Sequence, residues 1–152
     1  RSWDFFGKEI EKHKFSFIYA IHLFEHITEP QKFIKRLCAL LDYDGRYLLE
    51  VPNLEDPLLS IYKLEAFKKF YYVPHHVFFY TPKTIELLFQ EQTKKFKIKR
   101  IQRYGLINHL RWIIFKRPGN INWHIPVLDD IYKLILVYLF KKSDTMLIIG
   151  EK

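Results

Sequence analysis

The sequence predicts an α/β fold built on two neighbouring parallel strands joined by a crossover helix. Residues 15–21 form a short apolar run of aromatic and branched side chains, typical of a strand that is buried on both faces of a parallel sheet. Residues 28–41 place apolar side chains at helical spacing, and residues 47–51 form a second apolar run that Pro52 ends. Strand, helix and strand in this order make a βαβ unit, and such crossovers are almost always right-handed.

Local signals mark the ends of the crossover helix. Thr28 supplies a hydroxyl group for the N-cap, and Pro30 falls in the first turn, where a missing amide costs little. After the helix, Gly45 is expected to form a turn at positive φ before the chain re-enters the sheet. The helix is therefore expected to begin after Thr28 and to end before Gly45.

The rest of the chain continues the alternation of helices and strands. Thr81 and Pro82 are a second N-cap and first-turn pair, and they predict a helix that ends near Thr93. The remaining expected elements are a partly helical lead-in at 8–13, a loop and helix at 54–74, a half-exposed strand at 96–104, helices at 106–115 and 127–142, and a last strand at 145–149.

Length and composition bound the possible classes of protein. The chain has 152 residues, of which 49% are hydrophobic and 18% aromatic, so we expect a single domain with a proper core. The net charge of +8 would suit anionic partners, but the basic residues are dispersed, and nucleic acid is not an expected partner. The lone Cys38 favours a reducing compartment such as the cytoplasm. The longest apolar run, residues 134–140, is too short to cross a membrane.

Candidate site residues follow the two central strands. Ligands in open α/β sheets bind beyond the carboxyl ends of the strands, which here carry His22, Glu25 and His26 and then Pro52 and Asn53. His22 and His26 are four residues apart with Glu25 alongside, a set that could hold a metal. No further cysteine or acidic cluster completes such a set, so we predict no metal. The alternative for His26 is a structural hydrogen bond to backbone near the strand end.

A second histidine pair, His75 and His76, precedes the helix that starts at Thr81. Adjacent side chains point apart, so at most one of the two imidazoles is expected to face a cleft. That imidazole could act as a base near neutral pH. The alternative is a partly exposed loop histidine.

A family resemblance rests on three stretches of the chain. They are FSFIYAIHLFEHITEPQKFIKRLCALLDYDGRYLLEVPN at residues 15–53, HHVFFYTPKTIELLF at residues 75–89, and the expected strands at 95–104 and 145–152. Their order and spacing resemble the second half of the class I S-adenosylmethionine-dependent methyltransferase fold. The resemblance implies a partial Rossmann-like sheet with the family's strands in the order 4-5-7-6, the last strand antiparallel, and a helical insert at 106–144.

The resemblance also implies roles for individual residues. Ala20, Ile21 and His22 match the strand end that contacts the cofactor's methionine part, and Glu25 and His26 match the family's Glu-His turn. His22, His26 and His76 are the implied catalytic groups. The implied substrate-binding residues are Glu25, Pro52, Asn53, Tyr72 and His75.

The family's glycine-rich cofactor loop has no counterpart in these residues, since no Gly-x-Gly pattern occurs. The resemblance therefore implies S-adenosylmethionine as the cofactor of a full-length parent, and little activity from residues 1–152 alone. It also implies that the strand at 15–21 lacks one neighbour. An uncovered apolar edge invites pairing with another chain, so a homodimer is expected there.

Three functions are compatible with the sequence. The first is a methyltransferase, or its C-terminal portion, acting on a small-molecule, sugar or lipid-linked acceptor. The second is a non-catalytic interaction module derived from a methyltransferase. The third is a basic domain that binds nucleic acid or a membrane surface, for which the apolar helix at 127–142 would have to expose its apolar face.

Overall fold

The computed structural model describes residues 7–93, 95–118 and 125–152, and it contains a mixed four-stranded sheet of order β1-β2-β4-β3. β1 and β2 run parallel, whereas β4 runs antiparallel to both β2 and β3. The strands are β1 (Phe15–Ile21), β2 (Leu41–Pro52), β3 (Phe96–Ile101) and β4 (Thr145–Glu151). The α/β class and the parallel pair at the start of the chain are confirmed.

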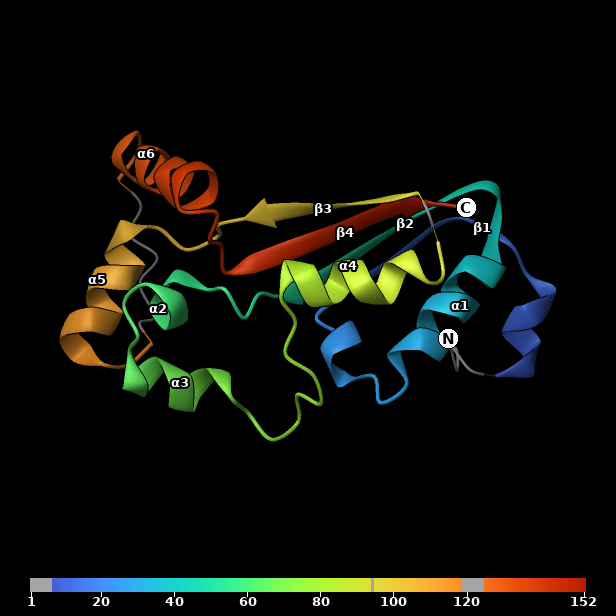
Figure 1. Cartoon of the computed structure of the whole chain (residues 1–152), viewed down its shortest axis with the longest axis horizontal. Coiled ribbons are helices and arrows are strands. Elements are labelled where there is room, and N and C mark those ends of the chain that lie inside the picture. The colour runs from blue at the N-terminus through green and yellow to red at the C-terminus, as the bar shows by residue number, and fades with distance from the viewer. Residues whose placement is uncertain (1–6, 94, 119–124) are drawn as a thin grey trace.

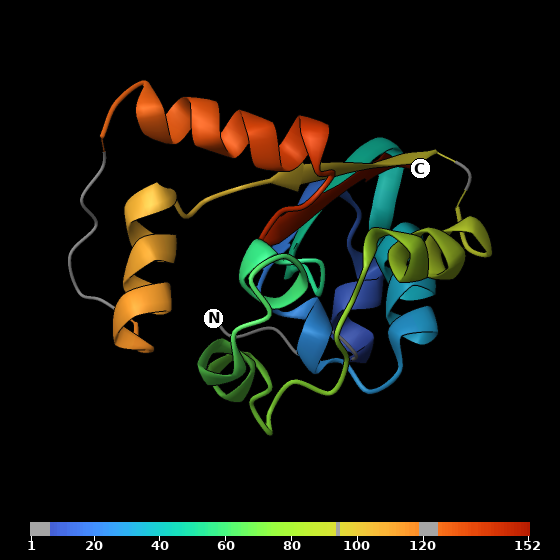
Figure 2. The ribbon, with the colours of Figure 1, turned by 60° about the vertical axis from the view of Figure 1, so that its left-hand side comes forward.

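Helices cover one face of this sheet and one end of it. Figures 1 and 2 show α1 (Pro30–Leu40) and α4 (Pro82–Gln90) on the same side of the sheet. In Figure 1 the other α-helices gather beyond the end where β1 and β2 finish. The remaining helices are η1 (Lys8–Lys12), η2 (Phe24–His26), α2 (Pro57–Ser60), α3 (Glu65–Tyr71), α5 (Leu106–Phe115), α6 (Leu128–Leu134) and η3 (Ile135–Leu139).

The main core lies between the sheet and the two helices α1 and α4. β2 supplies Tyr47, Leu49 and Val51 on alternate positions, as the period of a strand requires. Their cross-strand partners on β4 are Gly150, Ile148 and Met146. The other fully packed members are Phe24, Phe33, Ile34, Leu37, Leu41, Tyr80, Ile85 and Phe89. The crossover β1–α1–β2 is thus held by burial of one face of the sheet.

The opposite face of the sheet is largely open, which corrects the prediction that β1 is buried on both faces. Phe17, Tyr19 and Ile21 are 54%, 66% and 53% exposed, while Ile18 and Ala20 between them pack against the core. Alternate side chains of β1 point to the sheet face that α1 and α4 do not cover, and β1 is also an edge strand that pairs only with β2 among the described strands. Apolarity alone could not distinguish this arrangement from full burial.

Two details of the crossover also differ from the prediction. The N-cap of α1 is Glu29 rather than Thr28, and no side chain caps the helix. Gly45 lies inside β2 and does not adopt positive φ. A Cβ atom there would lie 2.8 Å from the carbonyl oxygen of Phe15, next to the register shift between β1 and β2. Close approach of two backbones, and not a left-handed turn, is the reason for glycine.

The other local predictions hold more closely. Thr81 caps α4 in a reciprocal capping box with Thr84, and Pro82 occupies its first turn. α5 has the predicted bounds, whereas the expected helix at 127–142 is α6 continued by the π-helical turn η3. The segment at 54–74 forms the two short helices α2 and α3. Residues 119–124 of the expected insert lie outside the described residues.

In the described part of the chain, no helix has both the length and the apolar composition that crossing a membrane requires.

Candidate functional site

A cavity of about 760 Å³ lies beyond the carboxyl ends of β1 and β2. Strand ends supply one wall, α3 and the link that follows it a second wall, and α5 a third. Its lining includes both carboxylates and imidazoles as well as aromatic rings. The aromatic part belongs to a second small core in which Phe67 packs edge-on against Trp112 with ring centres 4.9 Å apart. This is the place where ligands bind in open α/β sheets.

His22 ends β1 and reaches the cavity from an unusual backbone conformation. Its φ is +49°, which is uncommon for a residue with a side chain, and its amide donates to the carbonyl of Glu50 over 3.0 Å. The imidazole lies between two buried carboxylates: Nδ1 is 3.4 Å from Oε1 of Glu25, and Nε2 is 3.7 Å from Oε1 of Glu50. Arg103 forms an ion pair with the other oxygen of Glu50.

Glu25 lies in η2 and is only 2% exposed. Its backbone carbonyl accepts hydrogen bonds from the amides of Val77 and Phe78, over 2.9 and 3.1 Å. These bonds attach η2 to the link between α3 and α4. Both of its carboxylate oxygens are buried and have no hydrogen-bond partner in the described part of the chain. An unpartnered buried carboxylate is costly, so this side chain is a conspicuous polar feature of the cavity.

His26, His75 and His76 form a cluster of rings beside Glu25. The ring centre of His26 is 5.4 Å from that of His75 and 4.9 Å from that of His76. Nδ1 of His26 donates to the backbone carbonyl of His75 over 2.8 Å, so its Nε2 carries the lone pair. Burial lowers the pKa of His76, with Glu25 opposing that effect and the neighbouring imidazoles adding to it.

The site residues predicted from the sequence separate into two groups. His22, Glu25, His26, Pro52, His75 and His76 line the cavity, so the prediction that at most one of the adjacent histidines faces it is wrong. The structural alternative for His26, a hydrogen bond to backbone, is also present.

The second group lies away from the cavity. Asn53 is fully buried, and its side chain donates to Ser143 and accepts from the amide of Glu55. The ring of Tyr72 packs against Phe79 and Tyr71. Ala20 and Ile21 lie in β1 but do not belong to the cavity lining. None of these four residues lines the cavity.

Sequence analysis did not identify several polar residues that line the cavity. Asp56 caps α2 by accepting from the amide of Leu58 over 2.7 Å, and burial raises the pKa of its carboxyl group to about 7. Tyr71 lines the cavity with a buried hydroxyl group that has no partner in the described part of the chain, and burial raises its pKa. Pro57 directly after Asp56 indicates a helix start with Asp56 as the cap. No local sequence pattern indicates that the side chain of Asp56 or Tyr71 faces a cavity.

Asp144 fixes the wall formed by the ends of β3 and β4. Its carboxylate accepts from the amides of Arg103 and Tyr104 and from the side chain of Gln102. Burial raises the pKa of Asp144, and the hydrogen bonds from the amides of Tyr104 and Arg103 oppose the effect. The contacts place Arg103 at the cavity and explain why the segment after β3 stays close to the start of β4.

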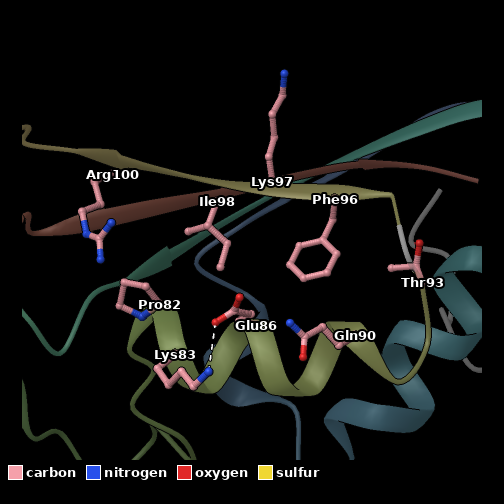
Figure 3. Close-up of a pocket in the computed structure, with 9 residues that line it drawn as sticks. All are labelled: Pro82, Lys83, Glu86, Gln90, Thr93, Phe96, Lys97, Ile98 and Arg100. Carbon is pink, nitrogen blue, oxygen red and sulfur yellow. Dashed lines mark hydrogen bonds and ion pairs between the residues drawn. The ribbon is translucent and has the colours of Figure 1, made fainter.

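Another hollow, of about 690 Å³, lies between α4 and β3 (Figure 3). Phe96 and Ile98 point from the strand toward the helix, whereas Lys97 points away from it. Lys83 and Glu86 of the helix form an ion pair over 3.3 Å, and Arg100 pairs with Glu55 over 3.6 Å. Because these charged groups are already paired with one another or with a neighbour, the hollow offers less reactive chemistry than the histidine-lined cavity.

Comparison with known proteins agrees with the fold. A family model described as "Methyltransferase domain" matches residues 2–92, more than half of the chain. No curated protein matches the sequence.

Several solved structures share the fold at low sequence identity. A SAM-dependent methyltransferase from Archaeoglobus fulgidus aligns with a TM-score of 0.57 and 15% identity over 95% of this chain and 64% of its own. A possible histamine N-methyltransferase from Thermotoga maritima aligns with a TM-score of 0.55 and 17% identity over 92% and 56%. Phosphoethanolamine N-methyltransferase 2 from Haemonchus contortus, solved with S-adenosyl-L-methionine, aligns with a TM-score of 0.52 and 13% identity over 94% and 35%.

The chain thus spans less than two thirds of the length of each of these three structures. The family model covers the β1–α1–β2 crossover, the histidine-bearing link and α4. Together with the mixed sheet and the cavity at the carboxyl ends of its parallel strands, the family model identifies the chain as a member of the methyltransferase domain family.

Proposed function

We propose that this chain is the acceptor-binding, C-terminal half of an S-adenosylmethionine-dependent methyltransferase domain acting on a small-molecule, sugar or lipid-linked acceptor. The observation that carries the proposal is the cavity at the ends of β1 and β2, which combines His22, His26 and His76 with the buried Glu25. In this assignment β1, β2, β4 and β3 correspond to the family's strands 4, 5, 7 and 6. The segment between β3 and β4 is then the insert that shapes acceptor specificity.

The residues of the cavity can bind an acceptor and take its proton. Methyl transfer to a hydroxyl or amine needs alignment and a group that accepts the released proton. His26 presents the lone pair of Nε2 because its Nδ1–H is held by the carbonyl of His75. Burial lowers the pKa of His76, which favours the neutral imidazole that can accept a proton. The hydroxyl group of Tyr71, which has no partner among the described residues, can donate a hydrogen bond to the acceptor.

The residues of this chain could contact only the methionine end of the cofactor. Bound S-adenosylmethionine supplies an activated methyl group. His22, which lines the cavity, together with Ala20 and Ile21 at the end of β1, would lie at the cofactor's methionine end. No Gly-x-Gly pattern occurs in the 152 residues to hold the rest of the molecule. We therefore expect the chain alone to bind the cofactor weakly and to be inactive without the glycine-rich part.

A methyl-transfer assay tests this function. The gene's full product is incubated with methyl-labelled S-adenosylmethionine and a panel of small-molecule, sugar and lipid-linked acceptors, with residues 1–152 alone assayed in parallel. His26→Gln and His76→Gln should each lower transfer by about 100-fold or more, the size of a lost general base. His13→Gln, on the exposed segment before β1, is the matched control. Absence of cofactor binding by the full product would support the non-catalytic interaction module instead.

The open face and edge of β1 motivate a proposed homodimer. Tyr19 and Leu48 are register partners on the sheet face opposite α1 and α4, and Ile149 continues the same row. An apolar row beside an unpaired strand edge is a pairing site for another chain. A second copy of the chain would cover it. The reducing, cytoplasmic location inferred from Cys38 remains a prediction.

A membrane-surface role is favoured by one specific observation. The helix formed by α6 and η3 exposes Ile131, Leu134, Ile135, Tyr138 and Leu139, which recur at helical spacing on one face, with Tyr138 and Leu139 75% and 73% exposed. Lys141 follows directly and is also exposed. An apolar helical stripe beside basic residues suits adsorption to an anionic lipid surface, where a lipid-linked acceptor would be found.

Vesicle co-sedimentation tests the membrane-surface role. Wild-type protein should bind phosphatidylglycerol vesicles more strongly than phosphatidylcholine vesicles, and Leu139→Glu should abolish the binding. Tyr43→Glu changes an exposed aromatic residue elsewhere on the surface and should have no effect. Equal binding by both variants would remove the membrane-surface role and leave the methyltransferase proposal intact.

A further inference from the structure

Glu25, His26 and His76 bring three potential metal-ligand atoms within 4.8 Å of one another. They come from two segments that are far apart in the sequence, the turn η2 after β1 and the link between α3 and α4. The backbone bonds from Val77 and Phe78 to the carbonyl of Glu25 hold these segments together. The cluster is thus a product of tertiary structure, and its geometry does not depend on long flexible side chains at the surface.

The carboxylate of Glu25 lacks the compensation that a buried charge normally has. It is 2% exposed, and neither oxygen has a hydrogen-bond partner in the described part of the chain. Its single ion-pair contact there is with the imidazole of His22 over 3.4 Å, without hydrogen-bond geometry. Buried carboxylates are ordinarily paired with a cation or bound to a metal. A cation at the cluster would supply the missing partner.

His26 is already oriented as metal-binding histidines are. In such sites the imidazole commonly donates its second N–H to a carbonyl or carboxylate, which fixes both the tautomer and the ring orientation. The bond from Nδ1 of His26 to the carbonyl of His75 does this and leaves Nε2 available. His76, whose Nδ1 is buried without a partner in the described part of the chain, adds a second free imidazole nitrogen.

We propose that Glu25, His26 and His76 bind a divalent first-row transition-metal ion, with Zn²⁺ the representative case, at the floor of the cavity. Two imidazole nitrogens and one carboxylate oxygen form a ligand set that suits such an ion, and a fourth position remains open to the cavity. Ligands bound about 2.1 Å from one ion lie about 3.4 Å apart in tetrahedral geometry. Closing from the observed separations of up to 4.8 Å therefore takes side-chain adjustments of about 1 Å.

The ion would change what the cavity can do. An open coordination position would bind an acceptor hydroxyl oxygen directly and favour loss of its proton. With the ion bound, His26 and His76 would act as ligands instead of bases, and the base role proposed for them would pass to His22, which lies beside Glu25 at the cavity wall. The metal site itself does not require methyl transfer, so metal binding can be tested on its own.

Calorimetric titration of the full chain with ZnCl₂ tests the site. Wild-type protein should bind one ion. Glu25→Gln and His76→Gln should each lower the zinc affinity by about 100-fold or more, because losing a group that only hydrogen-bonds a ligand already lowers metal affinity by about 10–100-fold. His75→Gln is the matched control: its ring stacks on His26 but is outside the ligand cluster, and its carbonyl is retained. It should bind as wild type does. Equal affinity of wild type and His76→Gln would overturn the proposal.

A second measurement uses only the wild-type chain, in case Glu25→Gln fails to fold. Zinc should shift the imidazole nitrogen resonances of His26 and His76 in long-range ¹H–¹⁵N spectra and leave those of His13 and His75 in place. Zinc should also raise the unfolding temperature by mass action. Shifts confined to other histidines, or no shift at all, would overturn the proposal.

Discussion

Asp56 and His109 make opposite contributions to the pH dependence of the free energy of unfolding between pH 4 and 7. Replacing either residue should therefore reveal the contribution of the other. Both side chains are almost fully buried, at 4% and 1% exposure. Burial raises the pKa of Asp56 from 3.8 to about 7, with Leu58 opposing and Asp144 adding to the effect. Burial lowers the pKa of His109 from 6.5 to about 4, with Asp129 opposing the effect.

The sign of each contribution follows from where the proton is held. Folded Asp56 keeps its proton up to about pH 7 and the unfolded residue only to 3.8, so the free energy of unfolding falls by about 4 kcal/mol as pH rises through that range. Unfolded His109 takes up a proton below 6.5 and the folded residue only below about 4, so the free energy of unfolding falls by about 3 kcal/mol as pH drops through that range. The two slopes nearly cancel in the wild type.

Urea unfolding at several pH values between about 4 and 7.5, for wild type and both variants, measures the two slopes. Asp56→Asn keeps the cap of α2, because an amide oxygen can accept from Leu58, and should become more stable as pH rises. His109→Gln should become less stable as pH rises. Other titrating groups are common to all three proteins and cancel in the differences. Parallel profiles for the two variants would refute the assignment of these buried pKa values.

Four further substitutions test the core packing and the proposed homodimer. Phe24→Ala removes a fully buried ring from the main core and should lower the free energy of unfolding by about 3–5 kcal/mol in urea titrations; a loss under about 1 kcal/mol would contradict the core assignment. Tyr47→Phe deletes a buried hydroxyl group without a partner in the described part of the chain, and it should raise the free energy of unfolding by about 1 kcal/mol. Because a Cβ at Gly150 would lie 2.3 Å from both Cζ and the hydroxyl oxygen of Tyr47, Gly150→Ala should be destabilising, and Tyr47→Phe should not restore stability because it keeps the ring carbon. Tyr19→Lys should shift the protein from dimer to monomer in sedimentation equilibrium while Tyr43→Lys does not, and a monomeric wild type would end the homodimer proposal.

Features determined by neighbours in the sequence were predictable. The capping box at Thr81 needs only a threonine, a proline and another short hydroxyl side chain, all within four residues. The β1–α1–β2 crossover likewise follows from two apolar runs and a helical stripe. Errors arose where the same local pattern has two physical meanings. Gly45 and the apolar run of β1 are the examples, since backbone contact depends on which strand lies alongside and burial depends on which elements cover each face of the sheet.

The site was predictable only in part. His22, Glu25, His26 and Pro52 could be placed because the carboxyl ends of parallel strands meet at one edge of a sheet. From their spacing in the sequence, His22, Glu25 and His26 formed the possible metal-ligand set. In the structure the set is Glu25, His26 and His76, and His76 comes from a segment 50 positions beyond His26. Asp56 and Tyr71 reach the cavity through the folding of α2 and α3, which no periodicity specifies.

By itself, the sequence determined the class of fold, the crossover and the strand end at which the chemistry gathers, because short-range periodicity and capping are energetic preferences of neighbouring residues. The tertiary structure alone decided which face of β1 is open, that Asn53 points into the protein, and that two distant turns meet around the carboxylate of Glu25. The physical reason is that burial and electrostatic pairing are sums over contacts between segments, and the local pattern carries no record of which segments will touch.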